Sequence, residues 1–158
     1  MESSPAPAGD ERADSTLRAV GGVFLAALLL HGFDHLRRGF DVITPQVFWL
    51  GNLQLALAVV AVVLVFRRHW WGPAAAIAIG LPSAVGFTAA HLLPHWSALS
   101  DPFTGSQVAP HVTALSWVAA IFEIAADLAF AWAGLAVLRM RQTRGAWPST
   151  SSTSPTPT

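Results

Sequence analysis

The residues in this sequence best suited to chemistry are histidines and carboxylic acids at helical spacing. His31 and His35 lie four positions apart, as do Glu123 and Asp127, so each pair shares one face of a helix. His91 lies in a separate apolar stretch of the chain. Neutral imidazole nitrogens and carboxylate oxygens are ligands that zinc, iron and related divalent ions prefer. These five residues are the predicted ligands of a divalent metal ion, with zinc or iron as the favoured ions.

Further polar residues are predicted to support these ligands. Asp34 borders the helix face that the first histidine pair shares, where a carboxylate can orient a metal-binding imidazole. Asn52 and His95 lie in or next to other apolar stretches and are assigned to the same supporting set. The assignment of His95 assumes that its helix continues past Pro94, a residue that often ends or bends a helix.

Arg37 and Arg38 form a basic pair at the end of the first apolar stretch. Long basic side chains at a helix end can extend toward the membrane surface, or they can pair with nearby acids such as Asp34, Asp41 or Asp101. Guanidinium groups also attract anions, so this pair is the predicted contact for an anionic head group or substrate.

The composition excludes several classes of protein. Charged residues make up 11% of the 158 residues and apolar residues 53%, whereas soluble domains carry roughly a quarter charged residues. The formal net charge is zero and no basic patch stands out, which argues against nucleic acid as a partner. The chain has no cysteine, so disulfides, thiolate zinc sites and a cysteine nucleophile are excluded.

Four stretches are long and apolar enough to cross a bilayer, which takes about 20 residues. The segment 55–66 contains only Leu, Ala, Val and Phe, so it lacks the polar face that a helix of a soluble bundle presents. We therefore predict an all-α fold, an integral membrane four-helix bundle that forms a single domain over residues 16–141. Its helices are expected over about 17–38, 47–67, 73–94 and 111–139.

The polar residues of the four predicted helices fall at one depth. With a rise of about 1.5 Å per residue, His31 lies about 18 Å above the cytoplasmic end of its helix and Asp127 about 16 Å. A carboxylate at that depth costs several kcal/mol unless it is protonated or paired, so such residues usually face the bundle interior and serve function. The metal site is therefore predicted between the helices, in the outer half of the membrane.

The distribution of arginine predicts the orientation. Arginines precede the first apolar stretch and follow the second and fourth, and with four spans these groups share one side, which the positive-inside rule makes cytoplasmic. Both termini are then cytoplasmic, and the polar layer lies toward the extracytoplasmic side of the plasma membrane. The tails, residues 1–15 and 142–158, are polar and rich in Ser, Pro or Thr, and they are predicted to be disordered. The expected partners are the lipid bilayer and a second copy of the chain in a homo-oligomer.

The function that best fits this pattern is a small multi-pass membrane protein with a metal-binding His/carboxylate cluster. The cluster would be catalytic if a metal-bound water attacked a substrate, with Glu123 or Asp127 as general base. The same residues also fit a proton- or cation-coupled transporter or channel-like subunit, or a non-catalytic membrane partner whose polar layer locks the helices together. Ligation of haem b by His35 and His91 fits less well, because carboxylates lie so close by.

Overall fold

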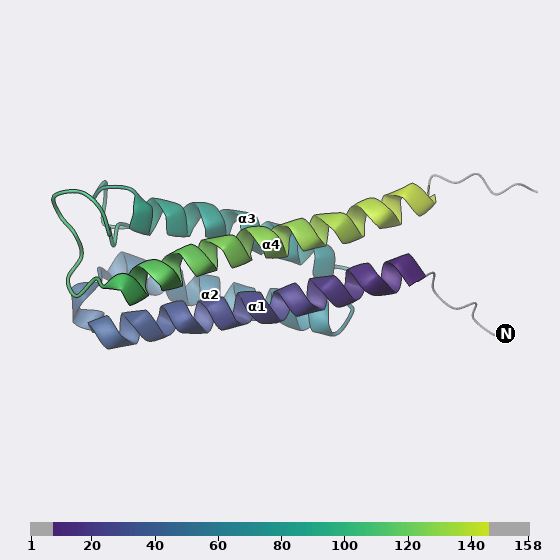
Figure 1. The fold of residues 1–158 in the computed structure, drawn as a ribbon, viewed down its shortest axis with the longest axis horizontal. Coiled ribbons are helices and arrows are strands. Elements are labelled where there is room, and N and C mark those ends of the chain that lie inside the picture. The colour runs from purple at the N-terminus through teal and green to yellow at the C-terminus, as the bar shows by residue number, and fades with distance from the viewer. Residues whose placement is uncertain (1–7, 146–158) are drawn as a thin grey trace, which may run out of the picture.

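The computed structural model describes residues 8–145, which form four helices that run side by side (Figure 1). In chain order the elements are α1 (Ala8–Arg38), η1 (Phe40–Val42), α2 (Pro45–Phe66), α3 (Gly72–Phe87), η2 (Thr88–Leu92) and α4 (Ala114–Gly145). The predicted all-α bundle of four helices is confirmed, and each helix, with η2 counted as the end of α3, is long and apolar enough to cross a membrane. The predictions for residues 1–7 and 146–158, which belong to the two expected tails, lie outside the described residues.

Consecutive helices are antiparallel, so the bundle has two distinct ends. The loop end carries η1 and the long connection 93–113, whereas the terminal end carries the α2–α3 turn and both ends of the described chain (Figure 1). Helices α1 and α3 each pack against α2 and α4. They therefore face one another across the diagonal of the bundle.

The helix boundaries follow local signals in the sequence. Thr44 caps α2, because its Oγ1 accepts the backbone N–H three residues later at 3.2 Å, and Pro45 occupies the first helical position, where an N–H would have no helical partner. After α2 the chain turns back at Arg68, which has a positive φ of 53°. Helix α1 begins at Ala8, upstream of the predicted start at 17, and α4 continues to Gly145, past the predicted end at 139.

Helices α3 and α4 approach closely through two glycines. A Cβ added at Gly80 would lie 2.5 Å from the backbone oxygen of Asp127, and a Cβ at Gly134 would lie 2.5 Å from the backbone oxygen of Pro73. Small residues at such positions let helix backbones come together in a membrane, where packing replaces the hydrophobic effect between helices. This contact fixes the height of α4, and so of Glu123 and Asp127, relative to α3.

Gly80→Ala is expected to lower the free energy of unfolding by about 1–3 kcal/mol, because the added methyl group forces the two backbones apart. Gly86→Ala, on the same helix, is the matched control, since nothing lies within 4 Å of its Cβ position. There the better helix propensity of alanine should raise the stability by up to about 1 kcal/mol. Unfolding of both variants in mixed micelles measures the difference, and equal effects would contradict the close approach.

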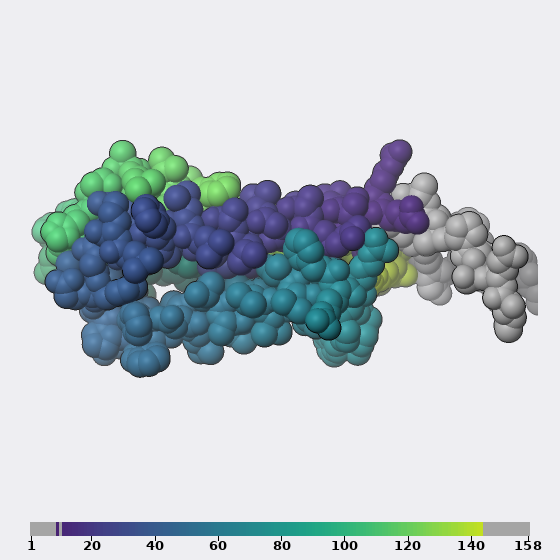
Figure 2. Space-filling view, turned by 90° about the horizontal axis from the view of Figure 1, so that it is seen from below, coloured from purple at the N-terminus to yellow at the C-terminus, as the bar shows by residue number. Residues whose placement is uncertain are grey.

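Helix α2 packs into the bundle mainly through its second half. Its buried side chains are Ala58, Ala61, Val62 and Val65, and residues 45–57 contribute none. Toward the terminal end these side chains join an apolar core around the stacked rings of Phe24 and Phe130. Figure 2 looks onto the side of the bundle where the purple-to-blue α1 and the blue α2 lie next to one another.

Candidate metal centre

Three histidines from the two diagonal helices meet near the loop end. His31 and His35 lie one turn apart on α1, and His91 comes from η2, the π-helical end of α3. One ring nitrogen of each lies within 4.8 Å of those of the other two. The ring centroid of His31 is 4.7 Å from that of His35 and 4.8 Å from that of His91, while the other two centroids are 5.8 Å apart. The three imidazoles thus form a compact triangle that could hold a metal ion.

The surroundings of the three rings distinguish their two nitrogens. The Nε2 atoms of His31 and His35 face each other at 3.0 Å. His91 Nδ1 lies 3.0 Å from the backbone oxygen of Asp101, to which it can donate its proton, so Nε2 is its free nitrogen. Nδ1 of His31 faces a carboxylate oxygen of Glu123 at 3.6 Å, and Nδ1 of His35 faces a carboxylate oxygen of Asp101 at 4.0 Å. Each ring therefore turns Nδ1 toward an oxygen atom, but only that of His91 is within hydrogen-bond distance; those of His31 and His35 have no partner among the described residues. A metal-bound imidazole usually donates its other nitrogen to such an oxygen.

The π-helical turn and the connection 93–113 together set the position of His91. A helix end leaves carbonyl oxygens without partners, and this connection supplies donors for them. The backbone N–H of Asp101 donates to Ala90 at 2.9 Å, that of Phe103 donates to His91 at 2.8 Å, and the hydroxyl of Thr104 donates to the next carbonyl at 3.1 Å. Short π segments occur frequently at functional sites, and here one carries a residue of the candidate centre.

Arg38 is buried and holds the acid that two of the histidines face. Its guanidinium donates to both carboxylate oxygens of Asp101 at 2.6 Å, and its Nε donates to the carbonyl of Pro110 at 3.2 Å. The guanidinium carbon also lies 5.5 Å from the ring centroid of Phe103. The side chain of Arg38 is 0% exposed, so the structure directs its charge into the protein. Bidentate arginine–carboxylate pairs are rigid, and this one fixes Asp101 against His35 and His91.

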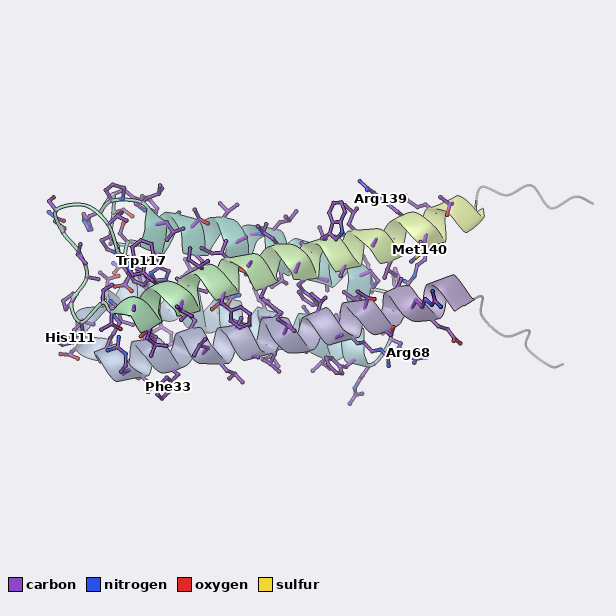
Figure 3. All side chains as sticks on the ribbon, viewed as in Figure 1. Phe33, Arg68, His111, Trp117, Arg139 and Met140 are labelled. Atoms are coloured by element: carbon purple, nitrogen blue, oxygen red, sulfur yellow. The ribbon has the colours of Figure 1, made fainter. Side chains whose placement is uncertain are left out.

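Arg37, the other member of the predicted anion-binding pair, joins α1 to α4. Its Nε and Nη2 donate to one oxygen of Asp34 at 3.0 and 2.8 Å. Nη2 also lies within hydrogen-bond distance of the His111 carbonyl and the Ser116 hydroxyl, at 3.0 and 3.1 Å. Figure 3 labels His111 at this loop end, where its Nδ1 lies 3.0 Å from the carbonyl of Arg38. The structure thus places Asp34 in an ion pair with Arg37.

Glu123 and Asp127 lie one turn apart on α4 with fully buried side chains. Among the described residues, none hydrogen-bonds to their four carboxylate oxygens. Glu123 lies beside His31, with a carboxylate oxygen 3.6 Å from its Nδ1, while Asp127 lies one turn closer to the terminal end. Both are too deep for water to satisfy them freely, so each calls for a proton or a cation nearby.

The remaining predicted supporting residues lie apart from the histidines. Asn52 is exposed on α2 and donates to the carbonyl of Phe48 at 2.8 Å. His95 is exposed in the connection 93–113, because the chain becomes extended at Leu93 and leaves the helix before reaching it.

Sequence reasoning did not identify Asp101 as part of the candidate centre. It lies outside the four apolar stretches and was considered only as an ion-pair partner of the basic residues. The available signal was that Asp101 is the one acid in the segment 93–113, which follows the histidine-bearing stretch directly.

Comparisons of the chain with protein-family models, with curated proteins and with solved structures gave no match. The fold alone does not define an activity, because four-helix bundles serve many functions. The feature of the protein that points to a function is the buried group of His31, His35 and His91, with the acids that surround it.

Proposed function

We propose that this protein binds one divalent transition-metal ion inside its membrane bundle, through Nε2 of His31, His35 and His91. The observation that carries the proposal is that one ring nitrogen from each of the three histidines lies within 4.8 Å of those of the other two. Ligands of a tetrahedral zinc ion lie about 3.3 Å apart when each bond is about 2.0–2.1 Å long. The Nε2 atoms of His31 and His35, at 3.0 Å, are already close to that separation, so small side-chain movements complete the site.

The charges around the site favour a divalent ion. Asp101 is already paired with Arg38, and Asp34 with Arg37. Glu123 is the nearest acid without such a pair, since its neighbour is the imidazole of His31. A buried ion with two positive charges, held by neutral imidazoles, would offset the charges of Glu123 and of the nearby Asp127 in a low-dielectric interior.

The shape of the histidine triangle favours a single ion over haem. A haem between His35 and His91 would need a flat gap between the two rings. His31 lies against both of them, with ring centroids 4.7 and 4.8 Å away. Three histidines around zinc leave one coordination position for water or another ligand, as in sites where zinc is catalytic. In this arrangement Glu123 orients His31 from its Nδ1 side and is not itself a ligand.

We further propose that the loop end faces the extracytoplasmic side of the plasma membrane. The two arginines nearest the loop end, Arg37 and Arg38, are both paired with acids. Arginines without such buried pairs, such as Arg68 and Arg139, lie near the terminal end (Figure 3). The positive-inside rule therefore places the terminal end in the cytoplasm.

Metal analysis of the purified protein in lipid nanodiscs tests the metal proposal. We expect one zinc or iron ion per chain, or one cobalt ion after loading, and a loss of affinity well above about 100-fold in His31→Ala, His35→Ala and His91→Ala, since even residues that only orient a ligand contribute 10- to 100-fold. His95→Ala is the matched control, because His95 is exposed and lies outside the group. A wild-type chain that binds no ion without chelators, or three variants that bind as well as wild type, would overturn the proposal.

A further inference from the structure

The half of α2 nearest the loop end leaves part of its bundle-facing side uncovered. In the other half, this side carries Ala58, Ala61 and Val62, all of them buried. Seven residues earlier, and so on the same face, stand Gly51, Gln54 and Leu55. Gly51 is exposed with nothing within 4 Å of its Cβ position, and Leu55 is 38% exposed. Gln54 is half-buried and donates to the hydroxyl of Ser83 on α3 at 2.7 Å, so the part of this face left open is that of Gly51 and Leu55.

The facing side of α1 shows the same opening. Gly21 lies on the side of α1 that faces the interior, because a Cβ there would lie 3.3 Å from Phe130 of α4 and 3.7 Å from Phe66 of α2. Gly32 and His35, eleven and fourteen residues later, fall on the same face of the helix. Gly32 is exposed with nothing within 4 Å of its Cβ position, and the side chain of His35 is 16% exposed.

These positions define a furrow between α1 and α2, which we call the lateral window. It is lined by the exposed Gly32, Gly51 and Leu55 and by the half-buried His35 and Gln54. Figure 2 looks onto this side and shows the surfaces of α1 and α2 separated by a furrow toward the loop end. Toward the terminal end the contact of Gly21 with α2 closes it. Toward the loop end it is bounded by Phe40 and Phe48, whose ring centroids lie 5.6 Å apart.

The approach to the histidines from the loop end is closed. Arg38, Asp101 and His91 are all at most 2% exposed, and the connection 93–113 is hydrogen-bonded over the end of α3. A separate apolar groove of about 320 Å³ between α3 and α4 is lined by residues such as Thr88 and Ile124, and no histidine lines it. Of these three approaches, the lateral window is the one that borders the only partly exposed ring of the candidate centre, that of His35, whose side chain is 16% exposed.

We propose that the lateral window admits a membrane-dissolved amphiphile, a molecule with an apolar chain and one head group that carries a lone pair, to the open coordination position of the metal. This inference rests on the proposed metal centre. The window lies within the apolar spans of α1 and α2, where the surrounding medium would be hydrocarbon. Its walls are glycine and leucine beside the half-buried amide of Gln54. Its floor is polar, because His35 lies there beside His31. The apolar chain of such a molecule would lie between the apolar walls, and the lone pair of its head group would reach the ion at the polar floor.

The test uses the cobalt-loaded protein in nanodiscs, with 1-dodecylimidazole as the probe. We expect the probe to shift the visible absorption bands of the bound cobalt. Gly32→Leu and Gly51→Leu fill the window from either side, and leucine is also the better helix former. Both variants should bind cobalt as wild type does, but respond to the probe at least about tenfold more weakly. Gly86→Leu is the matched control on α3, because its Cβ position is also free, and it should respond as wild type does.

The possible outcomes separate the two proposals. A wild-type chain that binds no cobalt overturns the metal centre and the window together. A wild-type chain that binds cobalt but does not respond to the probe, or leucine variants that respond as wild type does, overturns the window alone. Particle masses are measured in parallel. A wild-type dimer that Gly51→Leu converts to a monomer would also overturn the window as an entry, since a second copy of the chain would cover it.

Discussion

Arg38→Met is expected to lower the free energy of unfolding by about 3–5 kcal/mol, because it leaves the buried carboxylate of Asp101 without its partner. Asp101 accepts two hydrogen bonds of 2.6 Å from this guanidinium and is 2% exposed, so water cannot replace the lost charge. The same change frees the residue against which His35 and His91 lie, so metal affinity should fall as well. Unfolding in mixed micelles and cobalt titration measure the two effects separately.

Two further variants show whether the buried, unpaired carboxylate of Asp101 causes the expected loss of stability. Arg38→Met/Asp101→Leu removes both charges and should recover much of the lost stability, although not the metal affinity. Arg141→Met breaks the pair with Asp14, whose side chains are 42% and 34% exposed, and should change the stability by at most about 1 kcal/mol. If the double variant is as unstable as Arg38→Met, the loss arises from packing and not from the unpaired carboxylate.

Glu123→Gln is expected to lower metal affinity about 10- to 100-fold, the usual effect of removing a carboxylate that orients a metal-bound imidazole. The oxygen of Glu123 faces Nδ1 of His31 at 3.6 Å, and a glutamine of the same shape removes the charge without opening a cavity. The stability of the metal-free protein should not fall, because the variant replaces a buried carboxylate that has no hydrogen-bond partner among the described residues. Cobalt titration of the variant in nanodiscs measures the affinity.

Asp127→Asn is the matched control for Glu123→Gln. Asp127 is equally buried on the same helix but lies one turn farther along it, whereas the Glu123 carboxylate lies 3.6 Å from Nδ1 of His31. Its replacement should change metal affinity less than about tenfold, since it acts only through charge at a distance. An affinity that falls equally in both variants would restore Asp127 as a ligand, as the sequence had predicted.

The apolar runs and the spacing of the polar residues predicted most of the fold and part of the candidate site. Runs such as 55–66 predicted helices that can span a membrane, and the bundle follows from four of them. The four-residue spacing of His31 and His35 placed both rings on one side of α1, where the structure brings them together. The depth argument put both acids of α4 within about one turn of His31, with Asp127 nearest in height. In the structure the acid beside His31 is Glu123, one turn away from that expectation.

The rest of the site depends on irregular backbone that periodicity does not describe. A regular helix through Pro94 would keep His95 beside His91, but the chain leaves the helix after a π-helical turn, and His95 becomes exposed. Asp101 reaches the site only because the connection 93–113 folds back over the end of α3. Its pairing with Arg38 depends on contacts between segments far apart in the chain, which helix periodicity cannot specify.

The diagonal placement of α1 and α3 gives a bound ion a mechanical consequence. Neighbouring helices are held together by packing, whereas the candidate centre joins the two diagonal helices α1 and α3. An ion that joins α1 to α3 across the diagonal would resist movements of the four helices that distort the cross-section of the bundle. Such a distortion would also change the separation of α1 and α2, where the Cβ positions of Gly32 and Gly51 have open space around them. The ion would therefore stiffen the cross-section of the bundle and hold the opening beside it at one width.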